Sequence, residues 1–105
     1  MTAPAPTLAP LTPAESELLR DPDAWEVFQA LPGQDDDHRP FVRAIAADVA
    51  LPVSQVRLIL NHMGALRLAK YGQVLSLQTG QPIGSSWWLT RRGTDLRRWF
   101  AENAA

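Results

Sequence analysis

Two short helical patterns joined by a proline constrain the fold of this chain more than any other feature. In residues 41–60, FVRAIAADVALPVSQVRLIL, apolar side chains recur at spacings of three, four and seven on either side of Leu51-Pro52. Such spacing places apolar groups on one face of each helix. The predicted inward residues are Val42, Ile45, Ala46 and Val49 in the first pattern and Val56, Ile59, Leu60 and Met63 in the second. Two such helices that meet across a tight turn form a helix-turn-helix.

Charge is distributed unevenly along the chain. Residues 1–37 carry eight carboxylates and one arginine, whereas residues 38–105 carry nine lysines or arginines and three carboxylates. No aspartate or glutamate occurs between Asp48 and Asp95, a segment that holds five of the cations. An acid-free basic segment is typical of a surface that faces a phosphate polyanion. The alternative is that the basic part pairs with the acidic part inside one fold or across a dimer.

The composition limits the classes of protein to which this chain can belong. With 105 residues, 46% of them apolar, it is expected to form one domain with a small core. The absence of cysteine excludes a disulfide framework, a thiolate zinc site and a cysteine nucleophile, and it is consistent with a reducing cytoplasm. No leader pattern and no apolar run of about 18 residues occurs. We therefore expect a soluble cytoplasmic protein that does not insert into membranes.

Prolines and capping residues divide the first third of the chain. Residues 1–11 contain three prolines, so we expect a disordered N-terminal arm there and one domain over residues 12–105. The sequence Thr12-Pro13-Ala14-Glu15 has the pattern of a capping box, which predicts a helix to about Arg20. Asp21-Pro22 repeats the start signal, and the apolar stripe that follows ends at a Pro-Gly pair.

A polar loop precedes the helix-turn-helix. Residues 35–38 are three aspartates and a histidine, but adjacent side chains in a loop rarely converge on one metal ion, and we interpret them as solvated. Asp37 is the predicted cap of a helix over residues 40–50. The next helix is predicted over residues 53–63, and Gly64 is expected to end it in the left-handed conformation.

After the second helix the apolar period changes from helical to two, which predicts strands. The alternation covers residues 66–68, 74–78 and 86–89, and turn signals lie at Tyr71-Gly72 and at residues 79–84. We expect a small antiparallel hairpin, with or without a third strand. A last helix is predicted to begin at Thr90.

Two segments carry a resemblance to a known family. Residues 45–60, IAADVALPVSQVRLIL, resemble the helix-turn-helix core of bacterial winged-helix regulators of the MarR-like type. Residues 87–96, WWLTRRGTDL, are similar to the strand-to-helix ending of the same regulators. The resemblance implies an α+β winged helix-turn-helix with a three-helix core, a small antiparallel β wing and a C-terminal helix. It also implies a duplex DNA-binding protein that acts in transcription regulation.

Residues on the outward face of the second helix are the candidates for DNA contact. In a helix-turn-helix this helix lies in the major groove, and its early outward residues meet base edges. Amides pair with adenine and arginine pairs with guanine. The predicted base-facing residues are Ser54, Gln55, Arg57, Leu58, Asn61 and His62. Phosphate contacts are expected largely from Arg67, Lys70, Arg91 and Arg92.

Three features depart from the pattern of such regulators. Leu58 occupies a position that is usually polar or basic, and Ala50 replaces the usual turn glycine. An outward Leu58 can touch a thymine methyl group or can mark a protein-binding face. The wing tip, residues 79–84, has no basic residue, so we expect at most backbone or Gln81 contacts with DNA there.

Aromatic residues indicate a subunit contact. By analogy with the family ending, Trp87 points inward and Trp88 outward, and an exposed tryptophan favours an interface over a base-stacking platform. In the last helix Leu96, Trp99 and Phe100 form an apolar stripe. Such helices commonly mediate dimerisation in winged-helix regulators, so we expect a homodimer. The alternative is that the stripe closes the monomer's own core.

No motif supports catalysis. The two histidines lie in different elements, and neither a nucleophile elbow nor a glycine-rich phosphate loop occurs. We therefore predict a protein that is not an enzyme and uses no cofactor or metal. A second hypothesis comes from another class: a winged-helix protein-protein interaction module without sequence-specific DNA binding, with Leu58 and Trp88 as apolar anchors.

Overall fold

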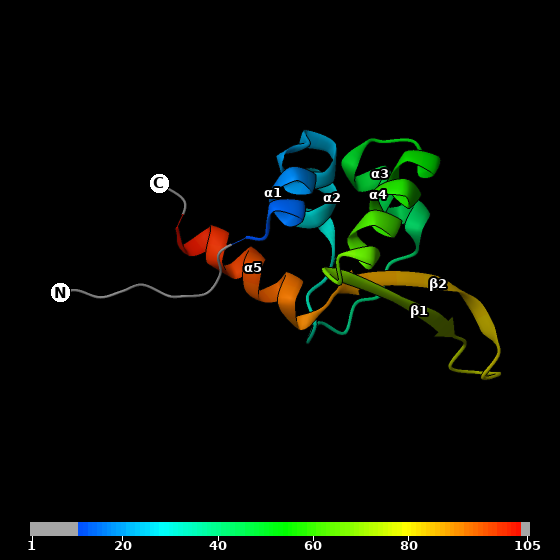
Figure 1. Cartoon of the computed structure of the whole chain (residues 1–105). Helices are drawn as coiled ribbons and strands as arrows, with labels where there is room; N and C mark the ends of the chain where they lie inside the picture. Colours follow the sequence, from blue (N-terminus) through cyan, green and yellow to red (C-terminus); the bar gives the residue numbers. More distant parts are fainter. Residues whose placement is uncertain (1–10, 104–105) are drawn as a thin grey trace.

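A computed structural model describes residues 11–103 of the chain. The elements in this part are α1 (Pro13–Arg20), α2 (Pro22–Ala30), α3 (Val42–Val49), α4 (Val53–Ala65), β1 (Ala69–Leu75), β2 (Pro82–Leu89) and α5 (Arg91–Glu102). In Figure 1 α1 and α2 lie beside α3 and α4, while the β-hairpin and α5 extend in opposite directions. The arm predicted for residues 1–11 lies outside the described residues except for Leu11, which packs against the core.

Capping side chains begin α1 and α2 where the sequence predicts. The Thr12 hydroxyl accepts a hydrogen bond from the Glu15 amide at 3.1 Å, and the Glu15 carboxylate accepts one from the Thr12 amide at 2.9 Å. This capping box satisfies two amides that would otherwise lack a partner. Asp21 accepts a hydrogen bond from the Asp23 amide at 3.0 Å and caps α2 in the same way.

Helices α3 and α4 form the predicted helix-turn-helix, with a bend of 108° between them. Ala50 makes the turn in the left-handed conformation, at φ 58°. The prediction that Asp37 caps α3 is wrong. The capping residue is Phe41, whose side chain makes no capping hydrogen bond. Because the backbone of Phe41 bridges to Ser86 in β2, it stays extended, and the helix begins only at Val42.

The prediction that Gly64 ends α4 is also wrong. The helix continues to Ala65, and the residue with a positive φ is Arg67, at 62°. Gly64 lies against Trp87 instead, since a Cβ at this glycine would stand 3.2 Å from the indole ring. The glycine therefore allows the helix to approach β2 closely rather than allowing the chain to reverse.

The sheet of the described residues has two antiparallel strands, β1 and β2. The turn predicted at Tyr71-Gly72 is wrong, because both residues lie inside β1. The hairpin turn follows Ser76, whose hydroxyl accepts hydrogen bonds from two amides of the turn. A third strand-like contact does exist, but it comes from the bridge between Phe41 and Ser86 and not from the leucines before β1.

The core joins the helices to the base of the hairpin. Residues with no exposed surface are Ala24, Val27, Phe28, Val56, Leu60, Met63, Leu68, Ser86 and Leu89. As predicted, Thr90 caps α5, and its hydroxyl accepts a hydrogen bond from the Gly93 amide at 3.1 Å. Within residues 11–103 no single helix has the length and hydropathy of a membrane span, and α3 and α4 reach these values only together, as a bent pair.

Candidate nucleic-acid interface

One face of α4 is buried and the other is open, as the apolar period predicts. The inward residues are Val56, Ile59, Leu60 and Met63, all of them less than 9% exposed. The exposed residues on the outward side are Ser54, Arg57, Leu58, Asn61 and His62. Leu58 lies among these polar residues and is 70% exposed. The outward face therefore offers polar groups and one apolar side chain to a partner.

Gln55 differs from the other predicted base-facing residues because it is half-buried. Its Nε2 donates a hydrogen bond to the Asp23 carboxylate at 2.5 Å, which ties the first turn of α4 to α2. The contact uses one of the two Nε2 hydrogens and leaves the side-chain carbonyl oxygen and the second hydrogen for another partner.

A groove of about 540 Å³ lies between α4 and the hairpin. Its walls come from Arg57 and Asn61 of α4 and from Tyr71, Ile83, Gly84, Ser85 and Trp87 of the strands, and Phe41, Val42 and Arg43 complete it at the start of α3. The lining contains two arginines and no carboxylate. The groove is therefore suited to a ligand with negative charge.

The similarity of this chain to known proteins lies in its structure. No protein-family model and no curated protein matches the chain by sequence. A crystal structure of a candidate DNA-binding protein from Ralstonia eutropha JMP134 is similar, with a TM-score of 0.60 and 25% identity over 76% of this chain and 95% of that chain. The crystal structure of the transcriptional regulator PA3341 gives a TM-score of 0.49 and 13% identity over 88% of this chain and 76% of that chain.

The fold is a winged helix-turn-helix. The hairpin of β1 and β2 is its wing, and α4 is the second helix of its helix-turn-helix. Two helices precede this unit, and α5 follows the wing. The fold class predicted from the sequence is thus confirmed.

Arg43 is a groove residue that the sequence analysis missed. It lies in the first turn of α3, is exposed, and has its guanidinium carbon 5.5 Å from the centre of the Phe41 ring. The acid-free segment begins only after Asp48, so a search confined to that segment passes over Arg43. Its position between the inward residues Val42 and Ile45 is the sequence signal that marks it as outward.

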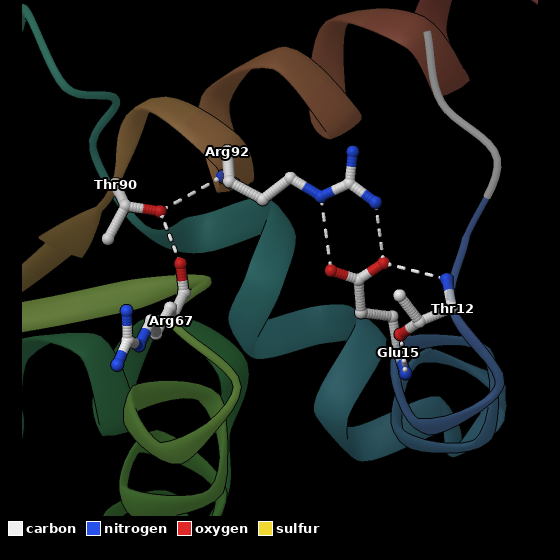
Figure 2. A network of polar contacts seen from close by, with 6 residues as sticks. Thr12, Glu15, Arg67, Thr90 and Arg92 are labelled. Carbon is white, nitrogen blue, oxygen red and sulfur yellow. Dashed lines mark hydrogen bonds and ion pairs between the residues drawn. The ribbon is translucent and has the colours of Figure 1, made fainter.

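Arg92 lies apart from the groove, in an ion pair with Glu15 of α1 (Figure 2). Its Nε and Nη2 donate to the two carboxylate oxygens at 3.1 and 2.7 Å. This hydrogen-bonded pairing lowers the pKa of Glu15 and raises that of Arg92. The acidic first third of the chain thus neutralises this cation, and its predicted role as a phosphate ligand does not fit the structure.

The other predicted phosphate ligands occupy two different places. Arg67 and Arg91 are exposed at the base of the wing, where the Thr90 hydroxyl donates to the Arg67 carbonyl oxygen at 2.7 Å (Figure 2). Lys70 neighbours Tyr71 in β1, so the two side chains point to opposite faces of the wing. The ammonium of Lys70 lies 6.0 Å from the Trp88 ring, away from the groove.

The predicted inward and outward roles of the two tryptophans are only partly right. Trp87 packs against the core and stacks on Tyr71, whereas Trp88 is half-buried rather than fully exposed. The Arg39 guanidinium lies 4.5 Å above the Trp88 ring, and the indole also fills the space beside Gly72. These contacts hold the Trp88 ring against the wing and leave part of it exposed.

The apolar stripe of α5 closes the monomer's own core, which was the alternative to dimerisation. Leu96 is 1% exposed, so its predicted place in a dimer interface is wrong. The Phe100 ring meets Trp25 at 4.9 Å and Phe28 at 6.5 Å between ring centres. Trp99 packs against Phe100 at 5.2 Å. Trp99 and Phe100 are half-buried, so part of each ring still faces outward.

The acidic loop before α3 forms hydrogen bonds with the protein. The Asp36 carboxylate accepts a hydrogen bond from the Gly33 amide at 2.7 Å. Among residues 11–103, no three histidine, aspartate or glutamate side chains stand close enough together to hold a metal ion.

Proposed function

We propose that this protein binds duplex DNA and regulates transcription in the manner of MarR-like regulators, with α4 in the major groove. The observation that carries the proposal is the groove between α4 and the wing, which has two arginines and no carboxylate in its lining. It adjoins the exposed polar face of α4. The similarity of the fold to a candidate DNA-binding protein, at 25% identity, supports the same function.

Base reading falls to the exposed residues of α4. Asn61 suits the N6 and N7 pair of adenine, and Leu58 suits a thymine methyl group. Gln55 is held by Asp23 and presents its remaining donor and acceptor in one orientation. A well-placed paired contact of this kind contributes about 1–3 kcal/mol to discrimination against a wrong base.

Phosphate contacts come from two groups of arginines. Arg43 and Arg57 line the groove between α4 and the wing, where the backbone of a DNA strand would run. Arg67 and Arg91 are exposed at the base of the wing. The proposed phosphate contacts do not include Arg92, because Glu15 binds it, or Lys70, because it lies on the far face of the wing.

A second candidate function rests on exposed apolar side chains. Leu58 is 70% exposed on α4, and the wing exposes Leu75, Leu77 and Ile83. Such residues are typical of a winged helix that binds another protein.

A homodimer remains part of the proposal, and its contact would use the half-exposed rings of Trp99 and Phe100 rather than Leu96.

A titration of the full chain against fluorescent random-sequence duplex tests the proposal. At low salt we expect binding at micromolar concentration or below, which weakens steeply as salt rises. Arg57→Ala should weaken it. Arg98→Ala is the matched control, because Arg98 is an exposed arginine on α5 that pairs with Asp95 at 3.7 Å, outside the groove. Failure of the folded protein to bind duplex at low salt would instead favour the interaction module.

A further inference from the structure

One wall of the groove contains an aromatic platform to which the proposed duplex contacts assign no role. Tyr71 and Trp87 face each other across the two strands, with ring centres 5.4 Å apart and planes inclined by 29°. Trp87 packs against the core and supports the pair from one side. Tyr71 is 61% exposed and lines the groove. The Tyr71 ring is thus held in place on one face and accessible elsewhere.

The groups around this platform match the parts of a nucleotide. The Asn61 amide offers a donor and an acceptor to the edge of a base. Arg43 and Arg57 offer guanidinium groups to a phosphate, and no carboxylate in the lining opposes the negative charge. The volume of about 540 Å³ lies within the range of roughly 300–1,000 Å³ that small-ligand sites occupy.

We propose that this groove binds an unpaired nucleotide, with its base stacked on Tyr71 and its phosphate held by Arg43 and Arg57. In an intact duplex each base is already stacked between its neighbours, so none is free to stack on the tyrosine. The inference therefore goes beyond the proposed duplex function. The ligand is either part of a single DNA strand or a free nucleotide, because both present the same base and phosphate.

A purely structural role for the platform makes a different prediction. Cross-strand aromatic pairs stabilise a hairpin with no ligand involved. If that were the whole role of Tyr71, its removal would loosen the wing but leave the affinity for single strands unchanged. The affinity of variants that stay folded separates the two accounts.

The first experiment titrates labelled oligothymidylate of about twelve nucleotides, a length within the usual site sizes, into the full chain. Tyr71→Ala should weaken binding roughly 5- to 100-fold, which corresponds to the loss of one stacked base. Tyr71→Phe keeps the ring and should stay within about twofold of the original. The matched control is Leu75→Ala, an exposed apolar residue of the same strand that is 52% exposed and lies outside the groove.

An abasic strand of equal length isolates stacking from phosphate attraction, because it keeps the phosphates and lacks the bases. It should bind more weakly than oligothymidylate, and Tyr71→Ala should weaken it no further. Equal binding of the abasic strand and oligothymidylate would overturn the inference, as would an unchanged affinity of folded Tyr71→Ala for oligothymidylate. Competition by free thymidine monophosphate identifies a free nucleotide as ligand, and its failure to compete identifies the strand.

Duplex binding is measured in parallel so that the two proposals fail separately. Tyr71→Ala should weaken binding of oligothymidylate far more than binding of duplex, whereas loss of the Arg57 side chain should weaken both. Binding of oligothymidylate through Tyr71 without duplex binding would retain this inference and reject the proposed function. The reverse result would retain the proposed function and reject this inference.

Discussion

The arginines of α5 and the groove arginines, Arg43 and Arg57, have opposite surroundings. Arg92 pairs with Glu15, and the Arg97 guanidinium donates to backbone carbonyls at the end of α2, including that of Leu31. Arg43 and Arg57 line a groove without any carboxylate. Among residues 11–103, the ion pairs are those of Arg92 and Arg98. The comparison shows that the role of an arginine depends on the groups around it in the fold, and not on how many cations its sequence segment contains.

The α5 arginines hold the helices together. Arg97 satisfies carbonyls that the last turn of α2 leaves unpaired, and burial lowers the pKa of its guanidinium. Arg92 joins α5 to α1 through two hydrogen bonds to one carboxylate. These contacts belong to folding stability. The groove arginines have no comparable contact in the described residues, so their removal should affect binding more than stability.

A large loss of stability is expected where α5 meets the base of the wing. Gly93 lies in the first turn of α5 against the base of the wing, and a Cβ there would meet the Leu68 carbonyl oxygen at 2.1 Å. Gly93→Ala should therefore lower the free energy of unfolding by about 3 kcal/mol, because backbone must move to make room. Urea denaturation measures it. A loss below about 0.5 kcal/mol would show that α5 and the wing move independently.

The next effect distinguishes a structural arginine from a groove arginine. Arg92→Ala leaves the carboxylate of Glu15, whose side chain is 7% exposed, without its cation. We expect a loss of about 1–3 kcal/mol in the free energy of unfolding, below the range for fully buried pairs because the Arg92 side chain is 37% exposed and partly screened. Arg57→Ala should cost less than about 0.5 kcal/mol in the same assay. Equal losses would remove the distinction.

Acid should lower the stability of the fold through protonation of Glu15. Because its pKa lies below the ordinary value of 4.5, the ionised carboxylate stabilises the folded state above that pH. This stabilisation is lost as pH falls below 4.5 through the lowered pKa of the folded state. Glu15→Gln should therefore show a smaller loss of stability between pH 7 and acid than the original chain. Parallel pH profiles of urea denaturation for both proteins would contradict the pairing.

The smallest stability effect is expected at Leu58, and the buried Leu96 is its reference. Leu58 is 70% exposed and Leu96 is 1% exposed. Leu96→Ala should lower the free energy of unfolding by about 2–5 kcal/mol, whereas Leu58→Ala should change it by less than about 0.5 kcal/mol. The Leu58 variant should instead alter binding to DNA or to a protein partner. A large thermal destabilisation by Leu58→Ala would show that Leu58 stabilises the fold rather than serving binding.

Local signals in the sequence predicted much of the fold. The capping box of Thr12 and Glu15, the cap at Thr90 and the inward faces of α3 and α4 each depend on residues within one or two turns. Such features can be found by spacing alone. The exposed face of α4, and with it the first half of the candidate site, follows from the same periodicity.

Features that depend on distant partners could not be predicted in this way. The bridge from Phe41 to Ser86 displaced the start of α3, and the approach of Trp87 explains Gly64. The pairing of Arg92 with Glu15 joins residues 77 positions apart. The acid-free segment includes Arg57, which lines the groove, but it also includes Arg92 and leaves out Arg43, because continuity along the chain is not proximity in space.

The most direct test of the account is the salt dependence of duplex binding when both groove arginines are replaced. If Arg43 and Arg57 each neutralise one phosphate, the double variant Arg43→Ala, Arg57→Ala should reduce the slope of log affinity against log salt by about 1.8, with little change in stability. The matched double variant Arg91→Ala, Arg98→Ala should reduce it by at most about 0.9, since only Arg91 is assigned a phosphate. An unchanged slope after loss of the groove arginines would contradict the account.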